Sequence, residues 1–134
     1  MSILIDESTR VMIQGLGRDG SFHAEQMKNY GTNIVAGVHP GKGGSSVHGF
    51  PVFNTASEAA RETGAECTVI FVPAPFAADA ILAGANAGVG LVVAVTEGIP
   101  VLDMSKIVRE LKELGTSLAG PNCPGLISPD KSKV

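Results

Sequence analysis

Three glycines near the start of the chain have the spacing of a phosphate-binding loop. In the stretch VMIQGLGRDGSFH, Gly15, Gly17 and Gly20 follow four residues suited to a buried strand and form the pattern G-x-G-x-x-G. Glycines at these positions permit a tight turn, close approach of backbone N–H groups to a phosphate, and close packing of the next helix. Because glycine-rich turns also commonly join a strand to a helix, the motif alone does not decide whether a nucleotide binds here.

The end of the next apolar run favours a phosphorylated ribose. After NIVAGV the chain supplies His39 and Lys42 and no acidic residue, whereas the usual NAD-binding pattern places Asp or Glu there to hold the ribose hydroxyls. A lysine among glycines suits a ribose phosphate, as found on coenzyme A or NADP. The alternative is a solvated loop lysine with no partner.

Other polar residues offer weaker candidates. Glu97 directly follows the run GLVVAVT, where its carboxylate could accept hydrogen bonds from a ligand's hydroxyl or amide groups; the alternative is an acid at the start of a helix. We expect His23 to pack or cap a helix, because no partner for catalysis is placed beside it. We expect Cys123 to be inert, because no neighbouring residue argues for an activated thiolate.

Alternating strands and helices must position these residues. Residues 10–14, 33–40, 67–72, 90–96 and, more briefly, 50–54 and 116–122 read as extended segments, and residues 21–31, 58–64, 75–88 and 101–115 read as helices. We expect Asp19 or Ser21 to cap the first helix and Thr55 or Ser57 the second. The alternation predicts an α/β fold, a Rossmann-like open, mostly parallel sheet with helices on both faces.

Ligands of such sheets bind beyond the carboxyl ends of the strands. Five segments rich in glycine and proline lie at those ends, namely 15–20, 39–44, 73–75, 96–100 and 120–125. The sequence therefore predicts that the glycine loop, Lys42 and Glu97 gather at one edge.

The composition bounds the number of domains and the classes of partner. The 134 residues are 44% hydrophobic and 17% charged, which suits one domain. Ten Lys and Arg against thirteen Asp and Glu give a net charge of −3, so no overall field favours nucleic acid or an anionic membrane. Two cysteines without metal-ligand spacing, and no signal peptide or membrane-length apolar run, predict a cytoplasmic protein.

The order of several longer motifs carries a resemblance to a known family. The blocks YGTNIVAGVHPGKGG, PVFNT, VIFVPAPFAADAI, TEGIP and GPNCPG make the chain resemble the amino-terminal, coenzyme A-binding domain of the α subunit of succinate–CoA ligase, also called succinyl-CoA synthetase. The resemblance implies a Rossmann-like domain that binds coenzyme A, in an enzyme that interconverts succinyl-CoA and succinate with synthesis of ATP or GTP. It also implies a β subunit that holds the nucleotide.

The resemblance implies which residues bind the coenzyme. They are Gly17, Arg18, Asp19, Lys42, Val95, Thr96 and Glu97, with Asn122 close to the reaction centre. The first loop departs from the family's usual G-x-T-G-x-x-G, because GLGRDG is one residue shorter and lacks the threonine. None of the three histidines matches the context of the family's phosphorylated histidine, which lies in a second domain.

We therefore expect residues 1–125 to form a coenzyme A-binding domain and residues 126–134 to begin a connection to a second domain. The chain alone is expected to bind coenzyme A without catalysis, with no catalytic residue or metal site of its own. An alternative is an NADP-binding Rossmann domain of an oxidoreductase or redox sensor, supported by the glycine motif and the basic end of the second strand. A third is a ligand-free module that contacts a β-like subunit. The acid substrate, the choice between ATP and GTP, and the oligomeric state stay open.

Overall fold

Strands and helices alternate along the chain as the sequence predicts. The computed structural model describes residues 8–119, 127–128 and 132–133. The elements in chain order are β1 (Val11–Gln14), α1 (Arg18–Tyr30), β2 (Ile34–Val38), β3 (Ser46–Val47), β4 (Phe50–Phe53), α2 (Ala56–Thr63), β5 (Cys67–Ile70), α3 (Ala74–Asn86), β6 (Leu91–Ala94), α4 (Val101–Leu114), β7 (Ser117–Ala119), β8 (Ile127–Ser128) and β9 (Ser132–Lys133).

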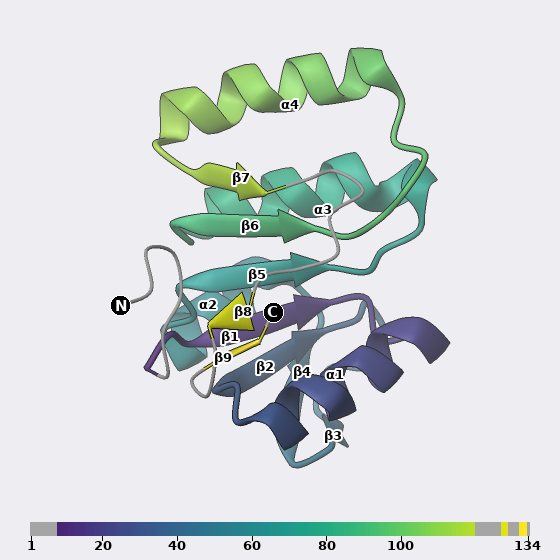
Figure 1. Ribbon diagram of the computed structural model, residues 1–134, viewed down its shortest axis with the longest axis vertical. Coiled ribbons are helices and arrows are strands. Elements are labelled where there is room, and N and C mark those ends of the chain that lie inside the picture. The colour runs from purple at the N-terminus through teal and green to yellow at the C-terminus, as the bar shows by residue number, and fades with distance from the viewer. Residues whose placement is uncertain (1–7, 120–126, 129–131, 134) are drawn as a thin grey trace.

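The main sheet has the strand order of a Rossmann fold. Its seven strands lie in the order β3-β4-β2-β1-β5-β6-β7, and every neighbouring pair is parallel except β3 with β4. The chain builds outward from β1 to β2 and β4 and then crosses to the opposite side of β1 to form β5. The order therefore reverses between β1 and β5, and such a reversal opens a crevice for ligands at the carboxyl ends of the strands. In Figure 1 these ends point to the right.

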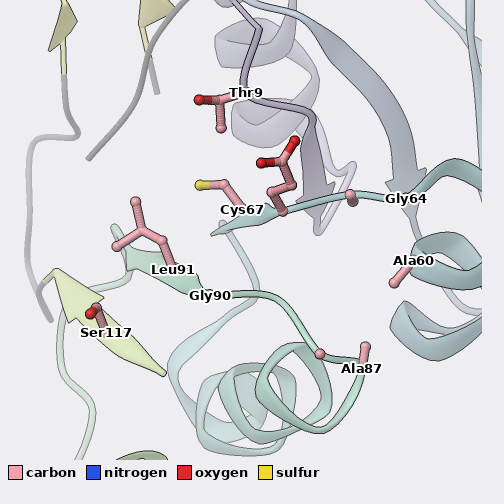
Figure 2. Close-up of a pocket in the computed structure, with 11 residues that line it drawn as sticks. Thr9, Ala60, Gly64, Cys67, Ala87, Gly90, Leu91 and Ser117 are labelled. Carbon is pink, nitrogen blue, oxygen red and sulfur yellow. The ribbon is translucent and has the colours of Figure 1, made fainter. Parts of the chain in front are cut away.

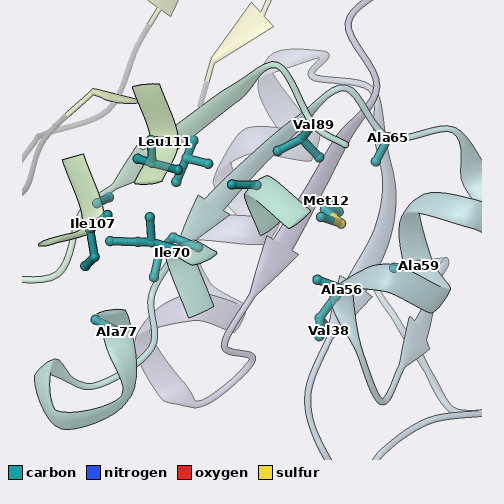
Figure 3. Close-up of a cluster of buried hydrophobic side chains, with 14 of the residues drawn as sticks. Met12, Val38, Ala56, Ala59, Ala65, Ile70, Ala77, Val89, Ile107 and Leu111 are labelled. Atoms are coloured by element: carbon teal, nitrogen blue, oxygen red, sulfur yellow. The ribbon is translucent and has the colours of Figure 1, made fainter. Parts of the chain in front are cut away.

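Helices cover both faces of the sheet, which confirms the predicted fold class. On one face, α2, α3 and α4 pack against β1, β5 and β6 through a cluster that includes Met12, Ile70, Ile81 and Leu111 (Figure 3). On the other face, α1 packs through Ala24 and Met27 against residues of β1 and β5. The buried strands β1, β5 and β6 have no exposed residue, as expected for a parallel sheet covered on both sides.

The starts of the first two helices differ in how they are capped. Helix α1 begins at Arg18, earlier than predicted, and its N-cap is Gly17, with no side-chain hydrogen bond. The prediction that Asp19 or Ser21 caps this helix was wrong, because both residues already lie inside it. Helix α2 has the predicted cap, since the Thr55 hydroxyl accepts a hydrogen bond from the Glu58 N–H at 3.1 Å.

The last described residues form a short antiparallel hairpin of β8 and β9. Strand β9 contacts α1. The predicted boundary at residue 125 and the predicted connection in residues 126–134 stay predictions. Within the described part of the chain, no helix has both the length and the apolar character needed to cross a membrane.

Candidate functional site

The three glycines of the first loop serve different purposes. Gly15 has a φ of +94°, and a Cβ there would lie 2.9 Å from the carbonyl carbon of Phe71. A Cβ on Gly20 would lie 1.9 Å from the carbonyl oxygen of Gly15. The protein's own packing therefore requires these two glycines. Gly17 has an ordinary φ of −72°, and a Cβ at that position would meet no atom within 4 Å. The packing of the protein therefore does not require glycine there, and the space beside Gly17 is open.

That open space lies at the start of α1. Because no side chain caps the helix, the N–H groups of its first turn are free to bind an anion, and the helix dipole favours negative charge there. Arg18, the first residue of the helix, is exposed, and Asp19 follows it in the same turn. The loop and helix start therefore have the features of a phosphate site.

The loop after β2 places Lys42 at the same edge. The Lys42 side chain is exposed and makes no ion pair with the described residues. Its N–H donates to the His39 carbonyl at 3.0 Å, and its carbonyl accepts the Ser45 hydroxyl at 2.6 Å. The backbone of Lys42 is thus held while its ammonium group stays available to a ligand.

His39 joins this loop to the glycine loop. The backbone N–H of Leu16 donates to Nδ1 of His39 at 3.2 Å. This bond requires a lone pair on Nδ1, so the geometry assigns the proton of a neutral ring to Nε2. His39 therefore acts as a link between the ends of β1 and β2, and no described carboxylate orients it as a catalytic base.

The end of β6 is tied to the end of β5 in a similar way. The Thr96 hydroxyl donates to the Val72 carbonyl at 2.7 Å, so its hydrogen is already used within the protein and its free lone pairs can only accept. Val95 is half-buried, and the Glu97 side chain is exposed. Of the three residues, Glu97 is the one whose polar group stands free at the edge.

A cavity of about 500 Å³ lies beside these loops, between the starts of α2 and α3. Its walls are mainly apolar and include Val38, Pro40, Ala56, Val72, Pro73 and Phe76. An apolar pocket next to an anion-binding helix start suits a ligand with a flat hydrophobic ring and phosphates. The structure thus gathers the glycine loop, Lys42 and the end of β6 at one edge, as predicted.

The remaining candidates from the sequence are His23, Asn122 and Cys123. The ring of His23 stacks on that of Phe71 with a centroid separation of 5.1 Å and an interplanar angle of 5°, which supports a packing role. Asn122 and Cys123 lie outside the described residues. Within the described part of the chain, no group of three or more His, Cys, Asp or Glu residues is gathered closely enough to hold a metal ion.

A second cavity, of about 560 Å³, lies at the opposite end of the sheet (Figure 2). It is bounded by Gly64, Ala87 and Cys67, among others. Burial, and secondarily the charge of Glu66, raise the pKa of the Cys67 thiol from 9.0 to about 12. The Glu66 carboxylate at this end pairs with Arg10 at 3.0 Å, and the helices α2 and α3 present their ends rather than their starts here, which suits a phosphate less well.

Two buried or bridging amides at the carboxyl edge escaped the sequence prediction. Gln14 ends β1, and its Nε2 donates to the Thr68 hydroxyl and to the Ala80 carbonyl, both at 3.0 Å, which seats α3 on the sheet. Asn54 follows β4, and its Oδ1 accepts the N–H groups of Gly41 and Gly43. A polar residue that ends an otherwise apolar strand was the available signal for both.

The chain matches a family model and several known proteins. The family model described as CoA binding domain matches residues 6–98, which include the glycine loop, Lys42 and the end of β6. Succinate–CoA ligase (ADP-forming) subunit alpha of Aquifex aeolicus is 56% identical over 137 aligned residues, covering all of this chain and 45% of the relative. Subunit alpha 1 of the same ligase from Archaeoglobus fulgidus is 57% identical, with 46% of it covered.

A solved structure shares the fold at lower sequence identity. ATP citrate lyase from Methanothrix soehngenii, solved in complex with citrate and coenzyme A, superposes with a TM-score of 0.87 at 17% identity, covering 97% of this chain and 23% of that chain. The present chain spans a little under half the length of the curated relatives it matches.

Proposed function

We infer the function from one premise: the chain belongs to the family of CoA binding domains. We propose that it forms the amino-terminal, coenzyme A-binding part of a succinate–CoA ligase α subunit. The observation that carries the proposal is the open, uncapped start of α1 at Gly17, which stands beside both an available lysine and an apolar cavity. The identity of 56–57% to α subunits over the whole chain supports the choice of ligase.

The described residues fit the separate parts of coenzyme A. The apolar cavity suits the adenine ring, and the free N–H groups at the start of α1 suit the pyrophosphate. Lys42 would meet the ribose 3′-phosphate, because it is the exposed cation on the loop next to the cavity. Glu97 would accept hydrogen bonds from the amides or hydroxyl of the pantetheine arm, and Thr96 and Val95 would line its path.

In the complete ligase, coenzyme A supplies the thiol that takes up the succinyl group. The residues described here bind and orient the coenzyme, and phosphoryl transfer needs a nucleotide and metal site elsewhere. We propose that a β subunit supplies the nucleotide site and that a second α domain supplies the phosphorylated histidine. On this basis the chain alone binds coenzyme A without forming succinyl-CoA, and Asn122 would act close to the reaction centre of the complete enzyme. We also propose a cytoplasmic location, which agrees with the free, buried thiol of Cys67.

The alternative, an NADP-binding oxidoreductase domain, draws on the same fold and the same lysine. It is weaker, because the family model for CoA binding matches through the glycine loop and the end of β2, where NADP recognition would also have to be encoded. A ligand-free module is weaker as well, since it gives no reason for the open helix start at Gly17.

Calorimetric titration of the purified chain with coenzyme A, NADP and NAD in parallel tests the proposal. We expect saturable binding of coenzyme A with one site per chain, and affinities for NADP and NAD at least tenfold weaker. Tighter binding of NADP would support the oxidoreductase alternative. A folded chain that binds none of the three would leave the ligand-free module.

A further inference from the structure

A single side chain holds the loop on both sides of Lys42. The N–H groups of Gly41 and Gly43 each donate to Oδ1 of Asn54 at 3.0 Å. Because an oxygen must face two N–H groups, the orientation of the Asn54 amide is fixed by these bonds. The backbone N–H and carbonyl of Lys42 also have partners within the protein. The side chain is therefore the part of Lys42 that can reach a ligand.

The fit between Asn54 and the loop is close. A Cβ added to Gly43 would lie 2.5 Å from Nδ2 and 2.6 Å from Cγ of Asn54. Asn54 therefore requires glycine at position 43, and a larger residue there would displace the amide. Asn54 also lines the apolar cavity at the carboxyl edge, so it touches the loop and the cavity at once.

We propose, on the basis of the proposed coenzyme A function, that Asn54 is a positioning residue that sets the preference for coenzyme A over dephospho-coenzyme A. Asn54 acts through Lys42. The residues from Pro40 to Ser45 are all exposed, and three of the six are glycine. Backbone bonds tie the far end of the segment to β4, since the Gly44 N–H donates to the Val52 carbonyl and the Val52 N–H to the Ser45 carbonyl. The stretch from Gly41 to Gly43 is held to the end of β4 by Asn54, and without that side chain its glycines would gain conformational freedom whose loss on binding would lower affinity. Asn54 orders the loop in advance, so the lysine is presented to the 3′-phosphate without that loss.

This role predicts an effect on specificity and not only on affinity. Dephospho-coenzyme A lacks the group that Lys42 would contact, so a disordered loop weakens coenzyme A more than its dephospho form. The readout is the ratio of the two dissociation constants, dephospho-coenzyme A over coenzyme A. A merely structural role for Asn54 would weaken both ligands alike and leave the ratio unchanged.

The test is a double-mutant cycle with Asn54→Ala and Lys42→Ala, measured by calorimetry with both ligands. We expect Lys42→Ala to lower the ratio by about ten- to a hundredfold, which corresponds to the free energy of one charge-assisted hydrogen bond. We expect Asn54→Ala to lower it on the order of tenfold in the wild-type background and not at all in the Lys42→Ala background. The control is Thr63→Ala, which removes a side-chain hydrogen bond to the Ala59 carbonyl at the far end of α2 and should leave the ratio unchanged.

A second variant leaves Asn54 and Lys42 in place. Gly43→Ala should displace the amide and lower the ratio as Asn54→Ala does, and because Gly43 is exposed the core is not involved. An unchanged ratio in folded Asn54→Ala or Gly43→Ala, or an equal decrease with and without Lys42, would overturn the inference while coenzyme A binding stands. Failure of the wild-type chain to bind coenzyme A would overturn the proposed function itself.

Discussion

The two ends of the sheet carry cavities of nearly equal size but opposite chemistry. The carboxyl-edge cavity, of about 500 Å³, lies where α2 and α3 begin and next to the start of α1. The amino-edge cavity, of about 560 Å³, lies where α2 and α3 end, at Gly64 and Ala87. Helix starts present N–H groups and partial positive charge, and helix ends present carbonyls and partial negative charge.

Charged side chains of both signs stand at each end, so they do not by themselves separate the two. At the carboxyl edge Arg18, Lys42 and Glu97 are exposed and Asp79 lines the cavity, whereas at the amino edge Glu66 pairs with Arg10 at 3.0 Å. Because helix ends rather than helix starts face it, the larger cavity is the less suitable one for a phosphorylated ligand. The direction of the strands and helices, more than volume, thus favours the carboxyl edge as the candidate site in this parallel sheet.

The same substitution made at both ends of the sheet tests whether only the carboxyl edge binds the coenzyme. Gly17→Val and Gly90→Val each place a side chain where no atom lies within 4 Å of a Cβ, and neither glycine has a positive φ. We expect Gly17→Val to weaken coenzyme A binding more than a hundredfold, about 3–6 kcal/mol, because it blocks two or more charge-assisted hydrogen bonds to phosphate. Gly90→Val should bind like the wild type.

Thermal unfolding provides the control for this pair. Gly17 is an N-cap without a side-chain bond, so valine there should cost about 1 kcal/mol of stability or less, and both variants should stay folded. Unchanged affinity in folded Gly17→Val would contradict the placement of the phosphates. Equal losses in both variants would contradict the distinction between the two ends.

A second comparison uses one cation from each end of the molecule. Lys42→Ala should weaken coenzyme A binding about ten- to a hundredfold, or about 1.5–3 kcal/mol, with a smaller effect on dephospho-coenzyme A. Arg61→Ala removes an equal charge from the last turn of α2, near the amino edge, and should change affinity less than twofold. If Lys42→Ala weakens both coenzymes equally, Lys42 contacts the pyrophosphate instead.

The fold was predictable because its signals are local and repeated. The apolar runs that became β1, β2, β5 and β6 are nearly continuous, as strands buried on both faces must be, and Thr55 caps α2 as expected. The start of α1 was misplaced because Asp19 and Ser21 are good capping residues. In this chain the helix instead begins at Arg18, after the N-cap Gly17, which has no side chain.

The arrangement of the candidate site was predictable only in part. The rule that ligands bind at the carboxyl ends of strands was enough to bring Gly17, Lys42 and Glu97 to one edge. The bonds that organise that edge were not predictable, because they join residues distant in sequence. Asn54 accepts the N–H groups of Gly41 and Gly43, which precede it by more than ten residues. The Thr96 hydroxyl donates to the carbonyl of Val72, in the loop after β5. Such pairs become visible only when the strand order is known.

The smallest expected effect is the pH dependence of stability that comes from Cys67, at the amino edge. Burial, and then the charge of Glu66, raise the pKa of Cys67 to about 12, from 9.0 for an unperturbed thiol. The folded chain therefore keeps the thiol proton above pH 9, while the unfolded chain releases it, so the stabilising contribution is present below pH 9 and is lost as the pH rises toward 12.

Denaturant unfolding of two proteins measures this contribution. With Cys123→Ser in both, Cys67→Ala is compared with the protein that retains Cys67. Between about pH 7 and pH 10 the folding equilibrium constant of the Cys67 protein should fall about tenfold relative to that of Cys67→Ala, because one additional proton is released on unfolding. The loss of packing in Cys67→Ala is the same at both pH values and cancels from this comparison. A pH-independent difference would contradict the raised pKa of Cys67, and with it the burial of this thiol at the amino end of β5.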